Sequence, residues 1–371
     1  MTTQSNKKIR ILHTEWSDGW GGQEIRIINE MAALREEGVE VFLACTSHSS
    51  IKVKAIEEKI EVLVLPFKGL LDFRTLFGLI KFIKLYQIDI VNTHSGKDTW
   101  VGGIAAIFAG VKFIRTRHLS NDINQSRLNF INELADFIMT TGTSIKNKMI
   151  KNNRIQPDKI ESIPTGIDSN VFNPKKYDRL LCRKKFEIEE NEIVFGMLAV
   201  LRKFKRHDRF LIMAKHLINE NRNKKIKFLI AGAGPRKEFI EKQILKLGLD
   251  GKVLLLGHIS ETAEFLNAID VFVLPSDSGE GVPQSLIQSL MMNKPSISTN
   301  AGSINDLLYD NNFLVVDKDS QEELNVAADR LVKEANLLKL YSNSRKVICE
   351  EFSKDAMTKK ILSIYDRVIN D

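Results

Sequence analysis

Residues 270 to 305, DVFVLPSDSGEGVPQSLIQSLMMNKPSISTNAGSIN, contain the clearest structural signals in the sequence. The stretch begins with an apolar run, Val271 to Leu274, that predicts a buried strand. A polar loop with two glycines follows, and the apolar stripe of the next segment predicts a helix whose first turn contains Pro283. A second apolar run, from 296 to 299, predicts the next strand. This order of elements is that of a parallel α/β sheet.

The loop of this stretch places a carboxylate, Glu280, shortly before the predicted helix N-terminus. A helix N-terminus offers free N–H groups, here near Gly281 and Val282, and the positive end of its dipole to an anion. An ordinary turn with a solvated glutamate has the same pattern. The stretch alone therefore leaves a ligand site and a plain turn as equal alternatives.

The composition is that of a soluble globular protein. The chain has 371 residues, of which 43% are hydrophobic and 27% charged, a length that favours two domains. The first ten residues lack the apolar core of a secretory signal, and the uncharged stretch from 101 to 111 is too short to span a bilayer. Three scattered cysteines, Cys45, Cys182 and Cys349, form no CxxC pair. We therefore expect a cytoplasmic protein.

The net charge of +7 comes from 54 lysines and arginines against 47 aspartates and glutamates. A positive balance suits nucleic acid, an anionic membrane surface or anionic substrates. The sequence has no nucleic-acid-binding motif, and its aromatic residues do not alternate with basic ones as a stacking surface requires. We therefore expect no nucleic acid among the partners.

The N-terminal part begins as a βαβ unit. Strands are predicted for residues 8–14 and 39–45, with a helix between them from 23 to 37. Gly21 and Gly22 lie at the start of this helix, where they would let a ligand approach the backbone closely. A simple tight turn explains them equally well. The pattern is not GxGxxG, so a dinucleotide is poorly supported.

The segment from 67 to 87 predicts a basic amphipathic helix, with Lys68, Arg74, Lys81 and Lys84 among apolar and aromatic residues. Such a helix can lie on an anionic membrane. It can equally pack on the core and leave its basic edge in solvent. Both interpretations remain open at this point.

Two predicted strands, 88–93 and 112–117, end at His94 and His118 respectively, and a helix is predicted between them from Trp100 to Ala109. Ligands of open α/β sheets bind outside the carboxyl ends of the strands. One histidine there is usually satisfied locally, whereas two at equivalent strand ends point to a ligand site. The alternation of strands and helices restarts after residue 175, which predicts a domain boundary there.

The second half repeats the pattern of strands followed by polar loops. A strand at 192–201 is followed by a basic segment, Arg202 to His207. The strand at 227–231 leads into Gly232 and Gly234, and the strand at 253–256 leads into His258. The tail from 321 onward is predicted to be mainly helical. The chain therefore consists of two α/β units of similar size.

Taken together, these motifs identify a family resemblance. The matching pieces are Gly21-Gly22, IPTGID at 163–168, LRKFKRHD at 201–208, IAGAGP at 230–235 and the stretch that begins at 270. In their order and spacing the chain resembles the retaining glycosyltransferases of family 4, within glycosyl transferases group 1. The resemblance implies the GT-B fold, an α/β architecture with two Rossmann-like domains facing across a cleft.

The resemblance also implies how the domains are used. Residues 1–175 would bind the acceptor, with the helix at 354–371 packing back on them, and residues 176–353 would bind the nucleotide-sugar donor. The family's E-x7-E pattern falls on Glu280 and Gln288. A glutamine amide can still bond a ribose hydroxyl, but without charge assistance.

The residue roles that the resemblance implies are as follows. Glu280 and His118 lie at the reaction centre and His94 lies on the acceptor side. Val200 occupies the family's usual arginine position, so Arg202 would assist Lys205, with Lys203 and Arg206 as alternatives. The donor diphosphate would be held by Arg202, Lys205, Gly281, Val282, Gly21 and Gly22, and the nucleoside by Gly232, Gly234, His258 and Gln288.

The implied function is transfer of a sugar from a UDP- or GDP-type donor to a hydroxyl of a glycan or lipid-linked acceptor. Lipopolysaccharide, O-antigen or another surface polysaccharide would be the product. The basic charge and the segment from 67 to 87 favour synthesis at the inner membrane face. We expect no metal and no cofactor, because Asp317 and Asp319 form the only Asp-x-Asp of interest and follow the site stretch. A nucleotide-sugar epimerase, a phosphorylase, a dehydrogenase and a non-catalytic sugar-nucleotide-binding protein are the alternatives.

Overall fold

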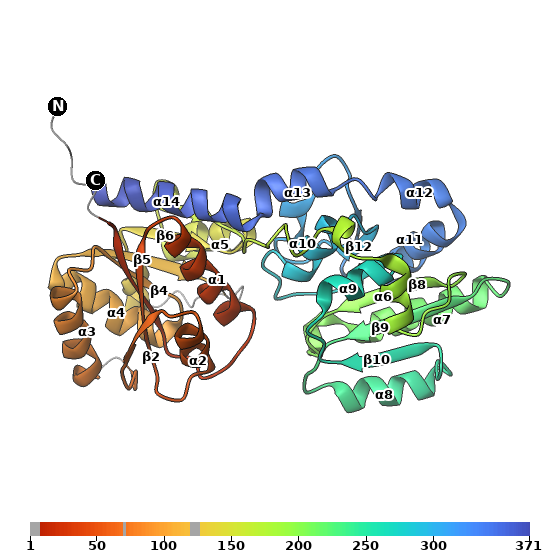
Figure 1. Ribbon diagram of the computed structural model, residues 1–371, viewed down its shortest axis with the longest axis horizontal. Coiled ribbons are helices and arrows are strands. Elements are labelled where there is room, and N and C mark those ends of the chain that lie inside the picture. The colour runs from red at the N-terminus through yellow and green to blue at the C-terminus, as the bar shows by residue number, and fades with distance from the viewer. Residues whose placement is uncertain (1–7, 70–71, 119–126) are drawn as a thin grey trace. The chain divides into compact units, whose positions relative to one another are not determined.

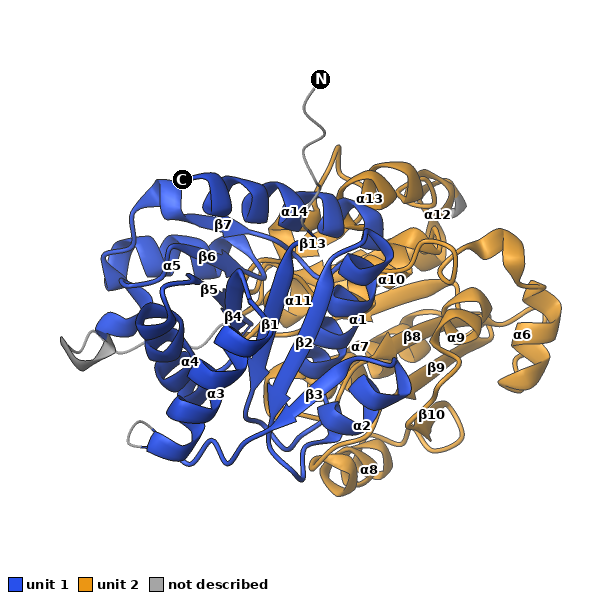
Figure 2. Cartoon of the chain, turned by 60° about the vertical axis from the view of Figure 1, so that its left-hand side comes forward, with its two compact units in different colours: residues 1–166, 354–371 blue, residues 167–353 orange. Residues whose placement is uncertain are grey.

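The computed structural model describes residues 8–69, 72–118 and 127–371. The chain divides into two compact units (Figure 2). Unit 1 consists of Met1–Gly166 together with Lys354–Asp371, and unit 2 consists of Ile167–Ser353. The junction after Gly166 lies near the boundary expected at residue 175, and the last helix belongs to unit 1.

In the described residues, unit 1 contains a seven-stranded sheet with the strand order β3-β2-β1-β4-β5-β6-β7, and every pairing in it is parallel. Apolar runs supply the buried strands of such a sheet, since helices cover both of its faces. The strands are β1 (Arg10–Glu15), β2 (Glu40–Cys45), β3 (Glu61–Val64), β4 (Ile90–Thr93), β5 (Lys112–Arg117), β6 (Phe137–Thr140) and β7 (Ile160–Ser162).

The helices of unit 1 connect these strands, and the last of them comes from the far end of the chain (Figure 1). α4 begins at Gly96 instead of the predicted Trp100, because Ser95 and Asp98 form a capping box at its start. The helices are α1 (Gly22–Glu36), α2 (Ser50–Glu57), α3 (Phe73–Leu85), α4 (Gly96–Ala109), α5 (Thr143–Asn153) and α14 (Lys354–Asn370).

α14 packs on α1 and completes one face of the unit 1 core (Figure 2). Its buried stripe includes Met357, Ile361, Ile364 and Tyr365, at the spacing of one helix face. The phenol oxygen of Tyr365 lies 3.3 Å from the side-chain nitrogen of Asn92, in the middle of the sheet. The final helix is therefore part of the core of unit 1.

Unit 2 contains a six-stranded sheet in the described part of the chain, with the order β10-β9-β8-β11-β12-β13 and only parallel pairings. The strand predicted at 271–274 is present with those bounds. The strands are β8 (Ile193–Leu198), β9 (Ile226–Ala231), β10 (Val253–Gly257), β11 (Val271–Leu274), β12 (Ser296–Thr299) and β13 (Leu314–Val316).

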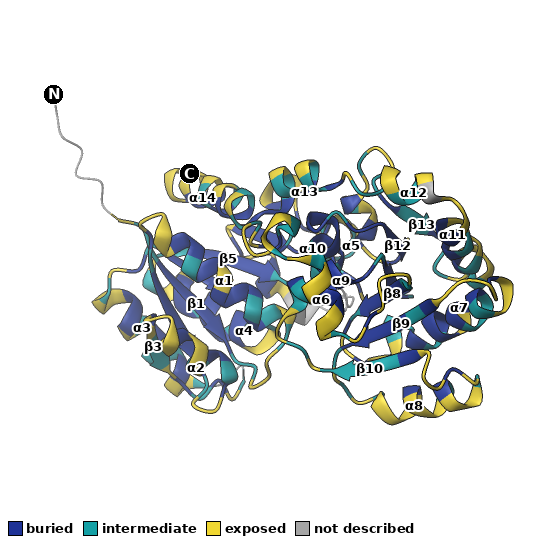
Figure 3. Ribbon diagram, turned by 45° about the vertical axis from the view of Figure 1, so that its right-hand side comes forward, coloured by how far each residue is buried: buried dark blue, intermediate teal, exposed yellow. Residues whose placement is uncertain are grey.

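The helices of unit 2 cover both faces of its sheet, so that the central strands are buried and the outer helix faces are exposed, whereas the edge strand β10 is mostly half-buried (Figure 3). Pro283 is the N-cap residue that directly precedes α10, whereas the sequence predicted it within the first turn of this helix. The helices are α6 (Arg179–Lys185), α7 (His207–Glu220), α8 (Lys237–Lys246), α9 (Thr262–Ala268), α10 (Gln284–Met291), α11 (Gln321–Lys333), α12 (Ala335–Leu340) and α13 (Arg345–Phe352).

Each sheet has one point at which the strand order reverses direction. In unit 1 it lies between β1 and β4, and in unit 2 between β8 and β11. At such a point the loops that leave the two strands diverge to opposite faces, and a crevice forms outside their carboxyl ends. Ligand sites in this fold are therefore expected at these two points.

Candidate functional site

Lys205 and Glu280 meet at the reversal point of the unit 2 sheet. Lys205 follows β8, Glu280 follows β11, and the two strands are paired. The Nζ atom of Lys205 lies 2.6 Å from Oε1 of Glu280, and the side chains are only 12% and 6% exposed. Two residues that the sequence assigned to one site are thus brought into direct contact.

The backbone around Glu280 is fixed by close contacts. Ser276 donates a hydrogen bond of 2.5 Å from Oγ to Oε1 of Glu280. Gly302 lies against the Glu280 carbonyl, where a Cβ atom would approach the oxygen to 2.0 Å, and its φ of +61° favours glycine. Residue 302 therefore has to be glycine if Glu280 is to keep this position.

The loop after β8 is joined to the loop that carries Glu280. The amide of Asp277 donates a 3.0 Å hydrogen bond to the carbonyl of Phe204. Arg206 has a φ of +53°, which is uncommon for a residue other than glycine. Its guanidinium contacts Asp208 at 2.8 Å and Asp277 at 3.2 Å. Arg206 thus joins the two loops, while Arg202 and Lys203 remain exposed.

Gly281 and Val282 are the residues whose backbone amides are predicted to bind the donor diphosphate. In the part of the chain that the structure describes, the amides of these two residues donate no hydrogen bond. They lie between Glu280 and Pro283, the residue that caps α10. Unpaired amides at a helix start, next to a lysine, form an arrangement that can bind a phosphate group.

Gly232 and Gly234 allow the loops after β8 and β9 to pack closely. A Cβ atom on Gly232 would lie 2.0 Å from the carbonyl oxygen of Ala199, and one on Gly234 would lie 2.8 Å from backbone atoms of Leu201. Their φ angles of +145° and +157° also require glycine. The observed role of these glycines is backbone packing, and their contact with a nucleoside stays a prediction.

The two other residues predicted for the nucleoside lie on different elements. Gln288 is half-buried on α10. His258 is exposed directly after β10, the edge strand, which β9 separates from β8. No contact joins either side chain to Lys205 or Glu280 in the described residues. Their roles stay predictions.

In unit 1, His94 and His118 lie together at the reversal point of the sheet. Nδ1 of His94 is 2.9 Å from Nε2 of His118. A third histidine, His13 in β1, extends the contact, because its Nδ1 atom is 2.9 Å from Nε2 of His94. Burial lowers the pKa of all three rings, that of His13 to about 3. The rings are therefore neutral at physiological pH.

A carboxylate cluster lies beside these histidines. Oε1 and Oε2 of Glu15, at the end of β1, accept hydrogen bonds of 2.8 and 2.9 Å from Oγ of Ser95, and Gln23 donates to the same carboxylate. Burial, reinforced by the negative charge of Asp98, raises the pKa of Glu15 to about 8. Glu15 is therefore mostly protonated at neutral pH, which makes it a hydrogen-bond donor as well as an acceptor.

Gly21 and Gly22 begin α1, as predicted, but a side chain from the helix itself occupies this end. Oε2 of Glu24 accepts a 2.9 Å hydrogen bond from the amide of Gly21. A carboxylate at this position stabilises the positive end of the helix dipole. An anionic ligand would have to displace Glu24 in order to bind the Gly21 amide.

His13 and Glu15 were not selected by sequence reasoning. Both lie within an apolar strand segment, where a polar residue is easily taken for an incidental one. A signal was nevertheless available, since side chains two residues apart on a strand share a face. His13 and Glu15 therefore point to the same side of β1, near its carboxyl end.

The three tryptophans of the chain all lie near the carboxyl edge of the unit 1 sheet. Trp16 and Trp20 are in the loop after β1, and Trp100 is near the start of α4. The Nζ atom of Lys97 lies 4.0 Å from the centre of a Trp16 ring, within the range of a cation–π contact. This edge thus combines exposed or half-exposed aromatic faces with a positive charge.

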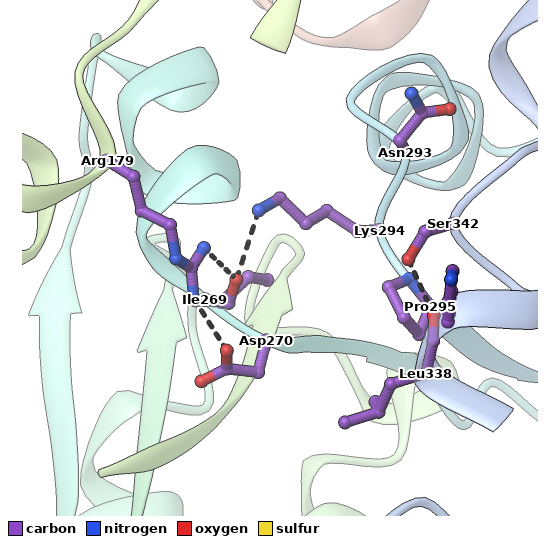
Figure 4. A pocket seen from close by; sticks show the side chains of 9 residues that line it. Arg179, Ile269, Asp270, Asn293, Lys294, Pro295, Leu338 and Ser342 are labelled. Carbon is purple, nitrogen blue, oxygen red and sulfur yellow. Dashed lines mark hydrogen bonds and ion pairs between the residues drawn. The ribbon is translucent and has the colours of Figure 1, made fainter. Parts of the chain in front are cut away.

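A separate pocket of about 380 Å³ lies at the opposite edge of the unit 2 sheet (Figure 4). Its lining residues Asp270 and Pro295 immediately precede β11 and β12. Lys294 donates to the carbonyls of Asn267 and Ile269 at 3.0 and 3.2 Å, and Arg179 also bonds Ile269. These cations satisfy the carbonyls at the end of α9, so their role is to cap that helix.

Asp317 and Asp319, the Asp-x-Asp of the sequence, lie in the turn between β13 and α11. Oδ1 of Asp317 accepts a 2.7 Å hydrogen bond from the amide of Asp319. Asn300 contacts the other carboxylate oxygen of Asp317 at 3.2 Å. Within the described ranges of the chain, no cluster of three or more potential ligands could hold a metal ion.

Comparison with protein families gives two matches. The family model described as glycosyl transferases group 1 matches residues 178–364. The model described as Glycosyltransferase Family 4 matches residues 20–171. Among curated relatives, the UDP-Gal:alpha-D-GlcNAc-diphosphoundecaprenol alpha-1,3-galactosyltransferase of Escherichia coli is 27% identical, and the alignment covers 99% of each chain.

Solved structures show the same fold. A glycosyltransferase from Rickettsia africae ESF-5 has a TM-score of 0.88 at 20% identity and covers 98% of this chain and 99% of its own. Anabaena Alr3699/HepE, solved in complex with UDP-glucose, has a TM-score of 0.82 at 17% identity and covers 97% and 100%. The predicted α/β architecture of the GT-B type, with two parallel sheets, is thereby confirmed.

Proposed function

This chain belongs to the glycosyl transferases group 1 family, and from that premise we propose that it transfers a sugar from a nucleoside-diphosphate sugar to a hydroxyl group of a glycan acceptor. The observation that carries the proposal is the contact between Lys205 and Glu280 at the reversal point of unit 2. A lysine, a carboxylate and unpaired amides at one strand edge suit a ligand with a diphosphate and sugar hydroxyls.

In the proposed donor site, Lys205 and the amides of Gly281 and Val282 hold the diphosphate, and the exposed Arg202 adds a second cation. The bond between the sugar C1 atom and the diphosphate oxygen breaks during transfer, so negative charge develops on the leaving group. Fixed donors aimed at that oxygen lower the barrier. Glu280 accepts hydrogen bonds from the sugar hydroxyls, and retention through front-side attack completes the proposal.

A UDP-sugar is the favoured donor. The E. coli relative is named for UDP-Gal, and the Anabaena structure contains UDP-glucose. Gln288 takes the ribose contact through its amide in this proposal, and Gly232, Gly234 and His258 line the nucleoside side. A GDP-sugar is the second candidate, and the sugar itself is to be identified by experiment.

A lipid-linked glycan is the favoured acceptor. The E. coli relative is named for a sugar diphosphate of undecaprenol. The aromatic edge of unit 1 suits such a ligand, because Trp16 offers a ring face to a sugar and Lys97 offers a positive charge to a phosphate. This assignment places the protein in the synthesis of a surface polysaccharide such as lipopolysaccharide or O-antigen.

Two measurements test the proposed function. A thermal-shift screen of nucleotide sugars identifies the donor, because a ligand at 100 times its Kd adds about 2.7 kcal/mol of stability. Release of the nucleoside diphosphate is then followed with and without a lipid-linked GlcNAc diphosphate. Release that depends on acceptor is the expected result. Binding without acceptor-dependent release would contradict the proposal and would favour an epimerase or a binding protein.

We further infer that the enzyme works on the cytoplasmic face of an anionic membrane. α3 buries Leu79, Phe82 and Ile83 against the core, yet Phe73 and Phe77 on its other side are 61% and 66% exposed (Figure 3). The helix spans Phe73–Leu85, shorter than the predicted 67–87, and its buried face packs on the core of unit 1 while its exposed face is the one that we propose to contact the membrane. Residues 70 and 71 of that segment lie outside the described residues.

The exposed face of α3 also carries the basic residues. Arg74, Lys81 and Lys84 are exposed together with Leu85, which is 69% exposed. A helix that lies at the lipid headgroup boundary typically combines aromatic and aliphatic side chains with neighbouring cations, as this face does. Among the residues that the structure describes, no helix is long and apolar enough to span a bilayer.

A further inference from the structure

His13, His94 and His118 form one continuous chain of hydrogen bonds through the reversal point of the unit 1 sheet. Each of the two nitrogen–nitrogen distances is 2.9 Å. The ring planes of His13 and His94 differ by 8°, and those of His94 and His118 by 33°. An imidazole N–H and the lone pair that accepts it both lie in the ring plane, so nearly parallel planes suit this contact.

The chain restricts the tautomers of the three rings. A neutral imidazole carries one N–H, so His94 must donate through one nitrogen and accept through the other. Only two patterns satisfy both contacts. Either all three rings carry the proton on Nδ1, or all three carry it on Nε2.

The inner end of the chain selects between these patterns. Nε2 of His13 is buried and has no hydrogen-bond partner in the described residues. If it carried a proton, the protein would contain an orphaned buried N–H, which is rarer than an unsatisfied acceptor.

We propose that His13 and His94 are positioning residues that hold His118 in the Nδ1–H tautomer, so that its outer nitrogen donates a hydrogen bond to an oxygen of the bound sugar. Nε2 of His118 accepts from His94, and Nδ1 has no partner among the described residues. The inference rests on the proposed function only for the identity of the ligand oxygen. The tautomer itself is a property of the protein without ligand.

This arrangement assigns His118 a definite chemical role. A ring whose outer nitrogen carries a proton cannot take the proton of the acceptor hydroxyl, so His118 is a hydrogen-bond donor and not the general base. The contact would strengthen if charge builds up on the sugar oxygen during transfer. His13 sets the tautomer of His118 only indirectly, through His94, and does not itself contact the ligand in this proposal.

The test is the tautomer of each ring, measured by long-range ¹H–¹⁵N correlation spectra of histidine-labelled full-length protein without ligand. The three rings are assigned from single variants, and the buried His207 of unit 2 is the internal reference. We expect the Nδ1–H pattern for His13, His94 and His118 at pH 7.5. An Nε2–H pattern or a charged ring at any of the three positions would overturn the proposal.

A matched pair of substitutions tests the positioning role. His13→Asn keeps an N–H in place of Nδ1–H, whereas His13→Phe keeps a ring of similar shape and removes the donor. We expect His13→Phe to release the tautomers of His94 and His118 into mixtures, and His13→Asn to preserve them. Unchanged ring signals in His13→Phe would contradict the proposal. Because His207 belongs to unit 2, folding of unit 1 in each variant is checked separately, from the circular dichroism spectrum and the urea unfolding curve of the whole protein.

Turnover separates this proposal from the proposed function. We expect His94→Leu to lower kcat by about tenfold or more, as the loss of a tautomer-fixing partner does elsewhere, and His94→Gln to restore much of it because an amide can both donate and accept. Equal losses in both variants would contradict positioning by hydrogen bonding. If His118→Gln left kcat unchanged while the spectra showed the Nδ1–H pattern, the proposed site would fail and the tautomer chain would stand.

Discussion

Nζ of Lys205 lies 2.6 Å from Oε1 of Glu280, although the two residues are 75 positions apart in the chain. The pairing of β8 with β11 brings the two residues together. Ser276 donates a hydrogen bond to the same carboxylate oxygen of Glu280 and so helps to fix its position. In the protein without donor, the carboxylate is thus the partner of the lysine that we assign to the diphosphate. Binding of the donor would exchange this partner for phosphate oxygens and free Glu280 for the sugar.

Lys205→Ala should lower kcat by about 10²-fold or more, because removal of one donor to a developing negative charge has an effect of that size. The substitution also leaves Glu280 without its cation, so the free energy of unfolding should fall as well. Steady-state kinetics and urea unfolding measure the two effects separately. The control is Lys242→Ala, at an exposed position of α8. A change in kcat within about threefold, less than 1.4 kcal/mol, would remove Lys205 from the diphosphate.

Gly302→Ala should displace Glu280, because the new Cβ atom would lie 2.0 Å from its carbonyl oxygen. Gly251→Ala is the matched control, since Gly251 has a φ of +70° and no atom within 4 Å of the added Cβ. The control should lose about 1–2 kcal/mol through backbone strain alone. Gly302→Ala should lose more stability and most of its turnover. Equal thermal shifts and intact turnover in the two variants would show that the contact with Glu280 is unimportant.

Full activity should survive treatment with EDTA. We propose a metal-independent transfer because Lys205, Arg202 and the free amides of the site can neutralise the diphosphate without a cation. Turnover is measured before and after chelation, and again after addition of Mg²⁺ or Mn²⁺. A loss of activity on chelation that Mg²⁺ or Mn²⁺ reverses would contradict this proposal. The variants Asp317→Asn and Asp319→Asn would then be tested for loss of the metal dependence.

His13 should make the protein less stable in acid. Burial lowers its pKa from 6.5 to about 3 in the folded state, so below pH 6.5 the unfolded state binds more protons than the folded state. Stability then falls as the pH falls, by about 1.4 kcal/mol per pH unit for this ring. Above pH 6.5 the ring contributes no slope.

Comparison of wild type with His13→Asn isolates this contribution, because asparagine does not titrate. The acidic groups that face the histidines, Glu15 and Asp98, have raised pKa values and act in the opposite direction, but they are common to both proteins. Urea unfolding at pH 7.5, 6.0 and 5.0 gives the difference in free energy at each pH. A difference that is the same at all three pH values would show that His13 has the same pKa in the folded and the unfolded protein.

Anionic vesicles should bind the protein through α3. Changing Lys68, Arg74, Lys81 and Lys84 to Gln should weaken co-sedimentation, since each cation near such a surface contributes about 1 kcal/mol. High salt should weaken binding of the wild type in the same way. The control changes Lys237, Lys242 and Lys246 of α8. Equal sedimentation of wild type and the α3 variant would refute the membrane proposal.

Much of the fold follows from short apolar runs bounded by turns. β5 was predicted from Lys112 to Arg117 and has those bounds. The start of α4 was placed too late, at Trp100, because the capping box of Ser95 and Asp98 was overlooked. The sequence could have supplied that correction, since a serine followed three residues later by an aspartate is a recognised helix start.

The histidine chain could not be predicted in the same way. His94 and His118 were found because each follows a strand, whereas His13 lies inside one and looks like part of the core. Its proximity to His94 depends on the pairing of β1 with β4, two strands that are far apart in the sequence. Similarly, no local signal indicated that Arg206 would bridge Asp208 and Asp277 with a positive φ angle.

The position of α14 has a consequence for synthesis of the protein on the ribosome. Met357, Ile361, Ile364 and Tyr365 belong to the core of unit 1, but they are translated only after all of unit 2. At roughly 5–20 residues per second, that delay is on the order of ten seconds or more. The core of unit 1 therefore remains incomplete on the face where α14 packs beside α1, while unit 2, which is contiguous, can already fold. During this interval the nascent chain is most prone to aggregate and to bind chaperones. The interval ends only when residues 354–371 have left the exit tunnel.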